Sequence, residues 1–228
     1  MAARRPIAVA FDVNGTLFAL DRLGDAFEDA GLPGHAIDLW FARTLASGFA
    51  LAASDTFASF AGLGRSHLRR ILRSFGLASD GATLDRLLGT LSELDAHEDV
   101  ESAFHRLHAA GARIVTLTNG SADLTRRLLE RNGLDGFVER CFEAAEAGRW
   151  KPRPEPYRHV AAELGVDAGA LALVAVHAWD VHGAKRAGLV SAWVNRLERE
   201  LLAEVDEPDV RARSLVEAVD ALLALPAV

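Results

Sequence analysis

Short apolar runs that each end at polar residues are the feature that most constrains how this 228-residue chain can fold. The runs are residues 7–11, ending at Asp12; residues 113–117, ending at Thr118-Asn119-Gly120; and residues 170–176, ending at His177-Ala178-Trp179-Asp180. A fourth, shorter run covers residues 191–194. The first of these runs is unbroken, which is typical of a strand that is buried on both faces.

Amphipathic helical stretches are predicted between these strands, at residues 101–110, 122–132, 155–164 and 181–187. A glycine follows each stretch, where helices tend to stop: Gly111, Gly133, Gly165 and Gly188. Strands and helices in alternation imply right-handed crossovers and a parallel sheet covered on both sides. The sequence therefore predicts an α/β fold with a Rossmann-like parallel sheet core. In such folds the site lies beyond the carboxyl ends of the strands.

Residues 20–95 interrupt this alternation. They predict helices at 21–30, 36–50, 56–61, 66–75 and 82–91, with no comparable strand. Because this segment directly follows the first strand and its turn, we expect an inserted α-helical cap domain (20–95) over an α/β core domain (1–19 and 96–228). The alternative is a set of helices packed on a sheet edge.

Composition excludes several classes of function. Net charge is -7 and the 25 basic residues are spread along the chain, which predicts no nucleic-acid surface. The single cysteine, Cys141, cannot form an internal disulfide and is expected to be a core residue in a reducing compartment. Neither a signal peptide nor a membrane-spanning run is evident. We therefore expect a cytoplasmic enzyme with a small-molecule substrate.

Asp12 is the candidate nucleophile. A carboxylate reacts poorly in water, so it must be desolvated, aimed and kept ionised by a positive charge and hydrogen-bond donors. Lys151 is the candidate cation, and Thr16, Thr118 and Asn119 are the candidate donors. The alternatives are a turn or helix-cap role for Asp12, a solvated surface role for Lys151, and capping chemistry for the threonines and the asparagine.

Residues 11–18 resemble the first motif of the haloacid dehalogenase (HAD) superfamily, in which an Asp opens a DxxGT turn after an apolar strand. Three further pieces are similar to the later motifs and follow in the same order: Thr118-Asn119-Gly120, Lys151-Pro152 with Pro154 and Tyr157, and Trp179-Asp180. The resemblance spans nearly the whole chain, and four matches in order are far more specific than one.

Two positions separate the branches of this superfamily. Its phosphatases place a second Asp two residues after the nucleophile to protonate the leaving alkoxide, whereas this chain has Asn14 there. They also cluster acids in the fourth motif to hold Mg²⁺, whereas Asp180 is followed by residues 181–184, Val-His-Gly-Ala. A halide needs no proton to leave. Residues 193–196, Trp-Val-Asn-Arg, also resemble a segment of one branch. Together, the matched motifs are most similar to those of the type II (S)-2-haloacid dehalogenases.

That resemblance implies a two-step displacement without metal or cofactor. Asp12 would attack the halogen-bearing carbon of a short 2-haloalkanoic acid, and water would then hydrolyse the ester. By the same resemblance Lys151 keeps the nucleophile ionised, Asp180 orients or activates the water, and Thr118-Asn119 help to bind the substrate carboxylate. Tyr157 is implied as a supporting hydrogen-bonding group, with a packed helix residue as the alternative.

Some positions depart from the family pattern. Family members commonly carry an Arg that grips the halide directly after the cap Trp, but here Phe41 follows Trp40, and Arg43 comes two places later. Two residues turn a helix by about 200°, so halide binding by Arg43 stays open. Ala175 and His177 replace a Ser and an Asn of the family. His177 is interpreted as a group that polarises water, binds the leaving anion, or caps the strand end.

The candidate site thus has a catalytic and a substrate-binding set, and no residue is assigned to a metal. The catalytic set is Asp12, Lys151, Asp180, Thr16 and His177; the substrate-binding set is Thr118, Asn119, Arg43, Phe41, Asn14, Tyr157 and Trp179. Several aromatic residues line an apolar pocket or belong to the core: Phe18, Trp40, Phe41, Phe57, Phe60 and Trp179. Two other functions stay open, a Mg²⁺-dependent HAD phosphatase and a lapsed HAD-fold binding protein. A homodimer through the apolar cap helices is a further expectation.

Overall fold

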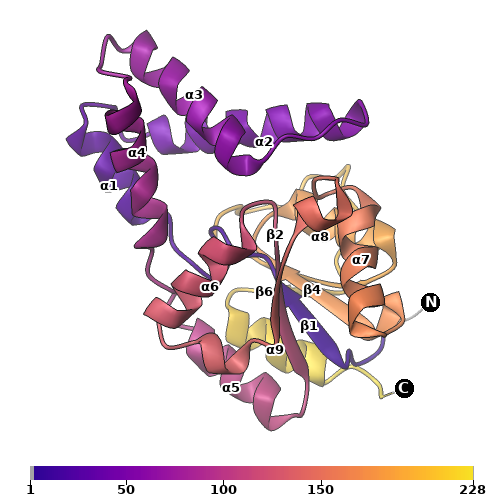
Figure 1. Cartoon of the computed structure of the whole chain (residues 1–228). Coiled ribbons are helices and arrows are strands. Elements are labelled where there is room, and N and C mark those ends of the chain that lie inside the picture. Colours follow the sequence, from indigo (N-terminus) through magenta and orange to yellow (C-terminus); the bar gives the residue numbers. More distant parts are fainter. Residues whose placement is uncertain (1–2, 228) are drawn as a thin grey trace.

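A parallel β-sheet forms the centre of the computed structural model, which describes residues 3–227 (Figure 1). Within this range the strands lie in the order β3-β2-β1-β4-β5-β6, and every neighbouring pair is parallel. Their bounds are β1 Ala8–Phe11, β2 Arg113–Thr118, β3 Arg140–Glu143, β4 Leu171–Ala175, β5 Val190–Val194 and β6 Val210–Ala212. The α/β fold predicted from the sequence is confirmed.

Helices cover both faces of the sheet because alternate residues of its strands point to opposite sides. Val9 and Phe11 of β1 pack into one core, whereas Ala8 and Ala10 pack into another. The first core includes side chains of α5 (Val100–Ala109), α6 (Ala122–Arg131) and α9 (Leu215–Leu223). The second includes those of α7 (Pro154–Leu164) and α8 (Ala178–Ala187). Burial on both faces explains why the inner strands are mostly apolar, and why β1 and β4 are apolar throughout.

The inserted segment forms a separate layer of helices beyond one end of the sheet (Figure 1). This α1–α4 layer consists of α1 Asp21–Asp29, α2 Ala36–Ala53, α3 Phe60–Ser74, α4 Gly81–Gly89 and the 3₁₀ helix η1 Thr90–Ser92. It has its own hydrophobic cluster, which includes Phe27, Trp40 and Leu68. Helix α2 extends across the space above the sheet in Figure 1, so the layer faces that end of the sheet.

The strands predicted from the sequence agree with β1, β2, β4 and β5 to within one residue at each end. The prediction missed β3, β6 and α9, and it missed the short 3₁₀ helices η2 Asp135–Phe137, η3 Ala144–Ala147 and η4 Ala168–Ala170. Strands β3 and β6 mix charged with apolar residues, because each lies at an edge of the sheet. The prediction of separate helices at 56–61 and 66–75 was wrong: Ser59 accepts a hydrogen bond from Gly62 N and caps a single helix, α3.

The four glycines predicted to stop helices all have positive φ, as left-handed helix ends require. Residues 1, 2 and 228 lie outside the described residues, and so do those ends of the predicted core domain. Among residues 3–227 no helix combines the length and the apolar character that crossing a bilayer requires.

Trp150 joins the α1–α4 layer to the sheet. Its indole is 1% exposed, belongs to the hydrophobic cluster of the layer, and donates a hydrogen bond to Ala58 O at 2.8 Å. Its ring also stacks on Phe60, with centroids 6.0 Å apart. A Cβ at position 48 would lie 2.3 Å from this ring, so Gly48 is what allows α2 to approach so closely. Because Lys151 is the next residue, this packing fixes one end of the loop that carries the lysine.

We expect Trp150→Ala to lower the free energy of unfolding by about 3–5 kcal/mol, because it removes a large buried ring and leaves a cavity. Urea denaturation followed by circular dichroism measures this. Leu202→Ala is the matched control: Leu202 is 68% exposed, and its loss should change stability by less than about 0.5 kcal/mol. A loss below about 1 kcal/mol for Trp150→Ala would contradict the role given to this residue.

Candidate active site

The carboxyl ends of the central strands bring the predicted catalytic residues together. Asp12 follows β1, Thr118 ends β2, and Asp180 lies in the first turn of α8, just after β4. Lys151 comes from the loop before α7. Because β1 lies between β2 and β4, these side chains meet around Asp12.

Asp12 has both carboxylate oxygens engaged. Oδ1 accepts a hydrogen bond from Lys151 Nζ at 2.8 Å. Oδ2 accepts one from Thr16 Oγ1 at 2.9 Å and lies 3.1 Å from His177 Nδ1. Burial alone would raise the pKa of Asp12, but the Lys151 ammonium and the His177 ring nitrogen hold it well below its usual range. The carboxyl group is therefore ionised, although it is only 5% exposed.

Lys151 bridges two carboxylates from inside the protein. Its ammonium is completely buried and donates to Asp12, to Asp180 Oδ2 at 2.6 Å and to Leu117 O at 2.7 Å. Burial lowers the pKa of Lys151, but the charges of Asp12 and Asp180 outweigh burial and raise it. All three ammonium protons are thus used, and the lysine stays charged.

Asp180 is held in place by groups behind it. Tyr157 donates its hydroxyl to Asp180 Oδ1 at 2.6 Å, and Lys151 occupies the other oxygen. Burial raises the pKa of Asp180, and the Lys151 charge offsets only part of this. A Cβ at position 183 would lie 2.6 Å from the Tyr157 hydroxyl, so Gly183 gives the tyrosine room to reach its partner.

The His177 imidazole stacks against two aromatic rings. Phe41 of α2 stacks on it with centroids 5.6 Å apart and planes inclined by 27°, and Trp179 stacks on it at 5.4 Å and 29°. The imidazole is 6% exposed and lies at the N-cap of α8. These contacts fix the ring nitrogen Nδ1 at its position beside Asp12.

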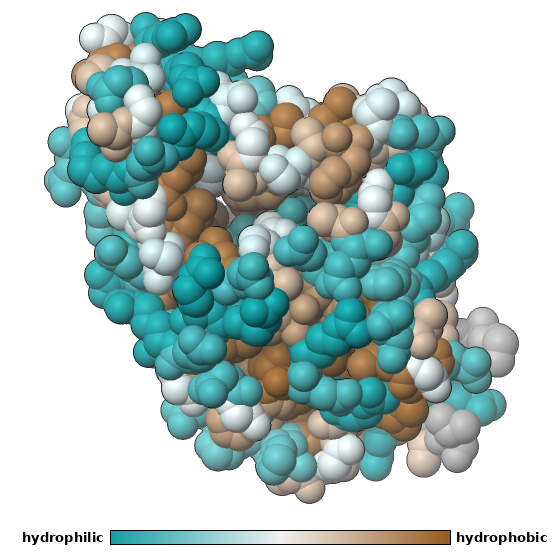
Figure 2. All heavy atoms as spheres, in the orientation of Figure 1, coloured by the Kyte–Doolittle hydropathy of each residue, from teal (hydrophilic) through white to brown (hydrophobic). Residues whose placement is uncertain are grey.

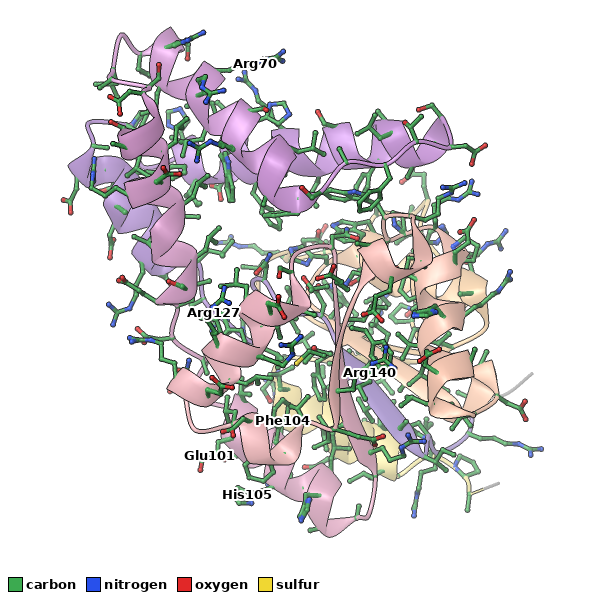
Figure 3. The ribbon with its side chains drawn as sticks, viewed as in Figure 1. Arg70, Glu101, Phe104, His105, Arg127 and Arg140 are labelled. Carbon is green, nitrogen blue, oxygen red and sulfur yellow. The ribbon has the colours of Figure 1, made fainter. Side chains whose placement is uncertain are left out.

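A small chamber lies above Asp12, between the sheet and the α1–α4 layer. Its walls come from Asp12, Asn14, Phe41, Leu45, Phe60, Thr118, Asn119, His177 and Trp179. Its volume of about 10 Å³ holds roughly one water molecule. A larger apolar groove of about 590 Å³ adjoins it and shares Asn14, Phe60, Thr118 and Asn119 as lining residues. Figure 2 shows the hollow between layer and core, with hydrophobic side chains within it. In Figure 3, Arg127 of α6 lies at the same opening.

A partly buried ion pair, which the sequence analysis did not assign to the site, holds the turn that carries Asp12. Arg196 donates to Thr16 O at 2.9 Å and pairs with Asp99 at 2.6 Å through both of its carboxylate oxygens. Asp99 also accepts from Leu215 N at the start of α9. The one available signal was that Arg196 ends the segment 193–196, just after a predicted strand.

The haloacid dehalogenase-like hydrolase family model matches residues 8–188. This range includes the residues bonded around Asp12, namely Thr16, Lys151, His177 and Asp180. The chain belongs to that family. Among its curated relatives are (S)-2-haloacid dehalogenase 4A of Burkholderia cepacia, 29% identical over 83% of this chain and 83% of the relative. The (S)-2-haloacid dehalogenase of Xanthobacter autotrophicus is 30% identical over 86% of this chain and 78% of the relative. A crystal structure of a dehalogenase with an intermediate complex superimposes with a TM-score of 0.87, at 25% identity over 98% and 99% of the two chains.

Within this hydrolase the structure brings Asp12, Lys151, Asp180, Thr16 and His177 into one cluster, as the sequence predicted for the catalytic set. Of the predicted substrate-binding set, the residues that line the chamber are Asn14, Phe41, Thr118, Asn119 and Trp179.

The structure places Arg43 outside the site, contrary to the sequence prediction. Its side chain is exposed on α2, on the opposite face from Phe41. Burial, then the charges of Arg70 (Figure 3) and Arg43, lower the pKa of His67 on α3. Arg43 therefore does not line the chamber above Asp12.

Two further predicted substrate contacts are engaged elsewhere. Tyr157 is completely buried behind Asp180 and is absent from the chamber lining, so it positions Asp180. The Asn119 amide accepts from Lys151 N at 2.8 Å and donates to Lys151 O at 3.2 Å. This side chain lines the chamber, yet its hydrogen bonds hold the loop that carries the lysine.

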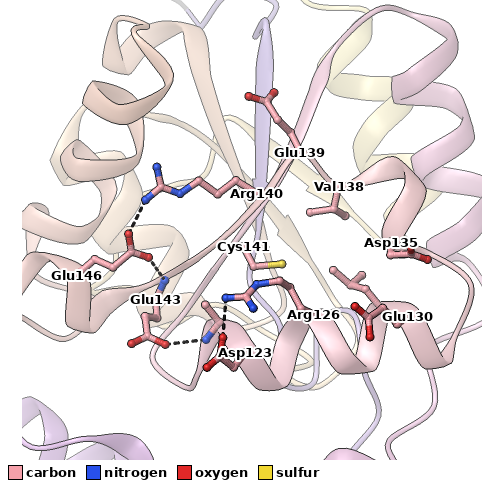
Figure 4. A pocket seen from close by; sticks show the side chains of 12 residues that line it. Asp123, Arg126, Glu130, Asp135, Val138, Glu139, Arg140, Cys141, Glu143 and Glu146 are labelled. Carbon is pink, nitrogen blue, oxygen red and sulfur yellow. Dashed lines mark hydrogen bonds and ion pairs between the residues drawn. The ribbon is translucent and has the colours of Figure 1, made fainter.

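A separate hollow at the β3 edge contains charged residues that pair with one another (Figure 4). Arg140 contacts Glu146 at 2.7 Å, and Arg126 contacts Asp123 at 2.6 Å. None of the residues that line it also lines the chamber above Asp12. This hollow is therefore separate from the chamber that contains Asp12.

Lys151→Met should lower the free energy of unfolding by about 3–5 kcal/mol near neutral pH, because it leaves buried carboxylates unpaired. Without the ammonium, burial would raise the pKa of Asp12 and Asp180 above their unfolded values. A carboxyl group with a raised folded pKa stabilises the protein when it is protonated, so the deficit should shrink as pH falls from about 8 to about 5. Urea denaturation across this range measures the trend.

Lys185→Met is the matched control for that series, because Lys185 pairs with Asp209 but its side chain is 33% exposed. We expect Lys185→Met to lower the free energy of unfolding much less than Lys151→Met does. We also expect this loss to depend little on pH in this range. A deficit for Lys151→Met that stays constant from about pH 8 to about pH 5 would contradict the electrostatic account of the cluster.

Proposed function

We propose that this hydrolase cleaves the carbon–halogen bond of a short 2-haloalkanoic acid through an aspartyl ester, without metal ion or cofactor, and releases the 2-hydroxy acid and halide. The observation that carries the proposal is an ionised, buried Asp12 that faces an apolar chamber. Apart from Asp12 itself, the chamber lining contains no carboxyl group that could protonate a leaving group. The relatives named as (S)-2-haloacid dehalogenases support the same chemistry.

In the first step, one oxygen of Asp12 attacks the halogen-bearing carbon from the side opposite the halogen. The new carbon–oxygen bond forms as the carbon–halogen bond breaks, and the halogen leaves with the electron pair as halide. The chamber removes water from the carboxylate, which makes it a stronger nucleophile, while Lys151 keeps it charged. Because halide is a weak base, the step needs no general acid.

Polar groups on the chamber wall hold the substrate. The Thr118 hydroxyl oxygen accepts from Gly120 N at 2.9 Å, which leaves its hydrogen for the substrate carboxylate. With the Asn119 amide bonded to Lys151, the contribution of Asn119 comes from its backbone. The Asn14 amide is a second donor on the wall and takes the departing halide in place of an arginine. Phe41 and Trp179 enclose the carbon chain.

In the second step, water attacks the Asp12 ester at its carbonyl carbon. Asp180 acts as a base through its raised pKa, in concert with Lys151, which lies between the two carboxylates. Tyr157 fixes the orientation of Asp180 throughout. The ester hydrolyses to regenerate ionised Asp12.

The α1–α4 layer serves as the cap of this site, in a cap domain of residues 20–95 on a core of residues 1–19 and 96–228. Phe41, Leu45 and Phe60 reach the chamber from α2 and α3 and exclude water. Since about 10 Å³ is too small for a haloacid, these side chains must move aside for substrate to enter. Homodimer formation, a cytoplasmic location and the absence of nucleic-acid partners stay predictions from the sequence.

The donor set does not favour the phosphatase alternative. Lys151 Nζ already neutralises the space between Asp12 and Asp180, with contacts of 2.8 and 2.6 Å. Asn14 supplies no acid for an alkoxide leaving group. A catalytically lapsed site is also disfavoured. Buried charges are costly unless they are paired, and here the buried charges of Asp12, Lys151 and Asp180 all remain paired and hydrogen-bonded.

We expect halide release from (S)-2-chloropropionate or bromoacetate in the presence of EDTA, and Asp12→Asn should lower kcat by about 10⁴-fold or more. Asp29→Asn, an exposed aspartate on α1, is the matched control and should retain full activity. Ion chromatography of the released halide gives the rate. Phosphate release from a general phosphoester that requires Mg²⁺, without halide release from any 2-haloacid, would overturn the proposal.

A further inference from the structure

The two oxygens of Asp12 have different partners. Oδ1 accepts a hydrogen bond from the Lys151 ammonium, a charged group that can also transfer a proton. Oδ2 has two donors of another kind, the Thr16 hydroxyl at 2.9 Å and the His177 ring at 3.1 Å. An ester of Asp12 retains one oxygen as a carbonyl and uses the other as the bridge to substrate. The two sides are therefore suited to different tasks.

The donors at Oδ2 are fixed in direction. Val176 N donates to Thr16 Oγ1 at 3.2 Å, so the hydroxyl hydrogen is free to point at Asp12. Because Asp12 is ionised, His177 must present Nδ1 as N–H to this oxygen. Phe41 and Trp179 both stack on the imidazole, and this packing holds that N–H in line.

We infer that Thr16 Oγ–H and His177 Nδ1–H form the oxyanion hole of the hydrolytic half-reaction, and that Oδ1 is the oxygen that attacks the substrate. The inference rests on the proposed function and assigns a task to His177, which the sequence left open among three roles. Both distances fall within the 2.7–3.1 Å typical of donors at a developing oxyanion. Preorganised donors of this kind stabilise the transition state without reorganisation.

The atoms balance as follows. After the first step, the ester has Cγ=Oδ2 as carbonyl and Oδ1 as the bridge to the substrate carbon. Water attacks Cγ, the carbonyl electron pair moves to Oδ2, and Asp180 accepts a proton from the water. The Cγ–Oδ1 bond then breaks, and Lys151 protonates the departing Oδ1, which leaves as the hydroxyl of the 2-hydroxy acid. Proton transfer from the new carboxyl group and from Asp180 restores the lysine and releases one proton to solvent.

Paired variants separate the donor from the packing. His177→Phe keeps an aromatic ring between Phe41 and Trp179 but has no N–H, whereas His177→Asn retains a donor of similar reach. Thr16→Val and Thr16→Ser form the equivalent pair at the second donor. Pre-steady-state burst experiments with excess (S)-2-chloropropionate would follow halide release by ion chromatography and the ester on the Asp12 peptide by mass spectrometry.

We expect His177→Phe and Thr16→Val to release one equivalent of halide rapidly and then to accumulate the ester, with hydrolysis slowed by about 10²-fold. His177→Asn and Thr16→Ser should recover most of the hydrolytic rate. If His177→Phe instead slows the halide burst and no ester accumulates, or if Asn fails to restore hydrolysis where Phe abolishes it, the oxyanion assignment is wrong.

One readout does not depend on turnover and so separates this inference from the proposed function. In the free wild-type protein, ¹⁵N NMR of His177 should show a proton on Nδ1 at neutral pH. An imidazole that carries its only proton on Nε2 would overturn the inference, even if wild-type enzyme releases halide normally. Failure of wild-type enzyme to release halide from any 2-haloacid would overturn the proposed function itself.

Discussion

The structure depends on one buried ammonium group, that of Lys151, placed between two carboxylates. Desolvation of a single carboxylate or ammonium costs several kcal/mol, so none of these three charges is stable alone at this depth. Together they satisfy one another at 2.6–2.8 Å. The result is a carboxylate that stays ionised in an apolar chamber, which is the condition that a carboxylate nucleophile must meet.

Much of the surrounding architecture holds that lysine in place. The Asn119 amide bonds both backbone groups of Lys151, and Leu117 O fills its third donor. On the other side Trp150 anchors the same loop in the α1–α4 layer. The adjacent residues Trp150 and Lys151 therefore connect the α1–α4 layer to the nucleophile Asp12. Movement of the layer, which substrate entry requires, acts on the site through Trp150 and through the contact of Phe41 with His177.

The sequence predicted those parts of the fold and site that repeat a simple physical pattern. Inner strands buried on both faces are mostly apolar, so β1, β2, β4 and β5 were predicted to within one residue. The edge strands β3 and β6 carry no such pattern, because one side of each is open. At the site, the strand ends indicated Asp12, Thr118 and Asp180. Helical spacing left the direction of Arg43 open, and no sequence pattern indicated that Asn119 and Tyr157 bond to other site residues.

The covalent ester is the central claim, and the fate of the water oxygen tests it most directly. A single turnover of (S)-2-chloropropionate in H₂¹⁸O, with enzyme in excess, should give 2-hydroxy acid whose hydroxyl oxygen is unlabelled, since that oxygen came from Asp12. The label should appear in the Asp12 side chain when the peptide is analysed by mass spectrometry. Product that carries ¹⁸O after this first turnover, with Asp12 unlabelled, would show that water attacks the substrate directly and would contradict the account.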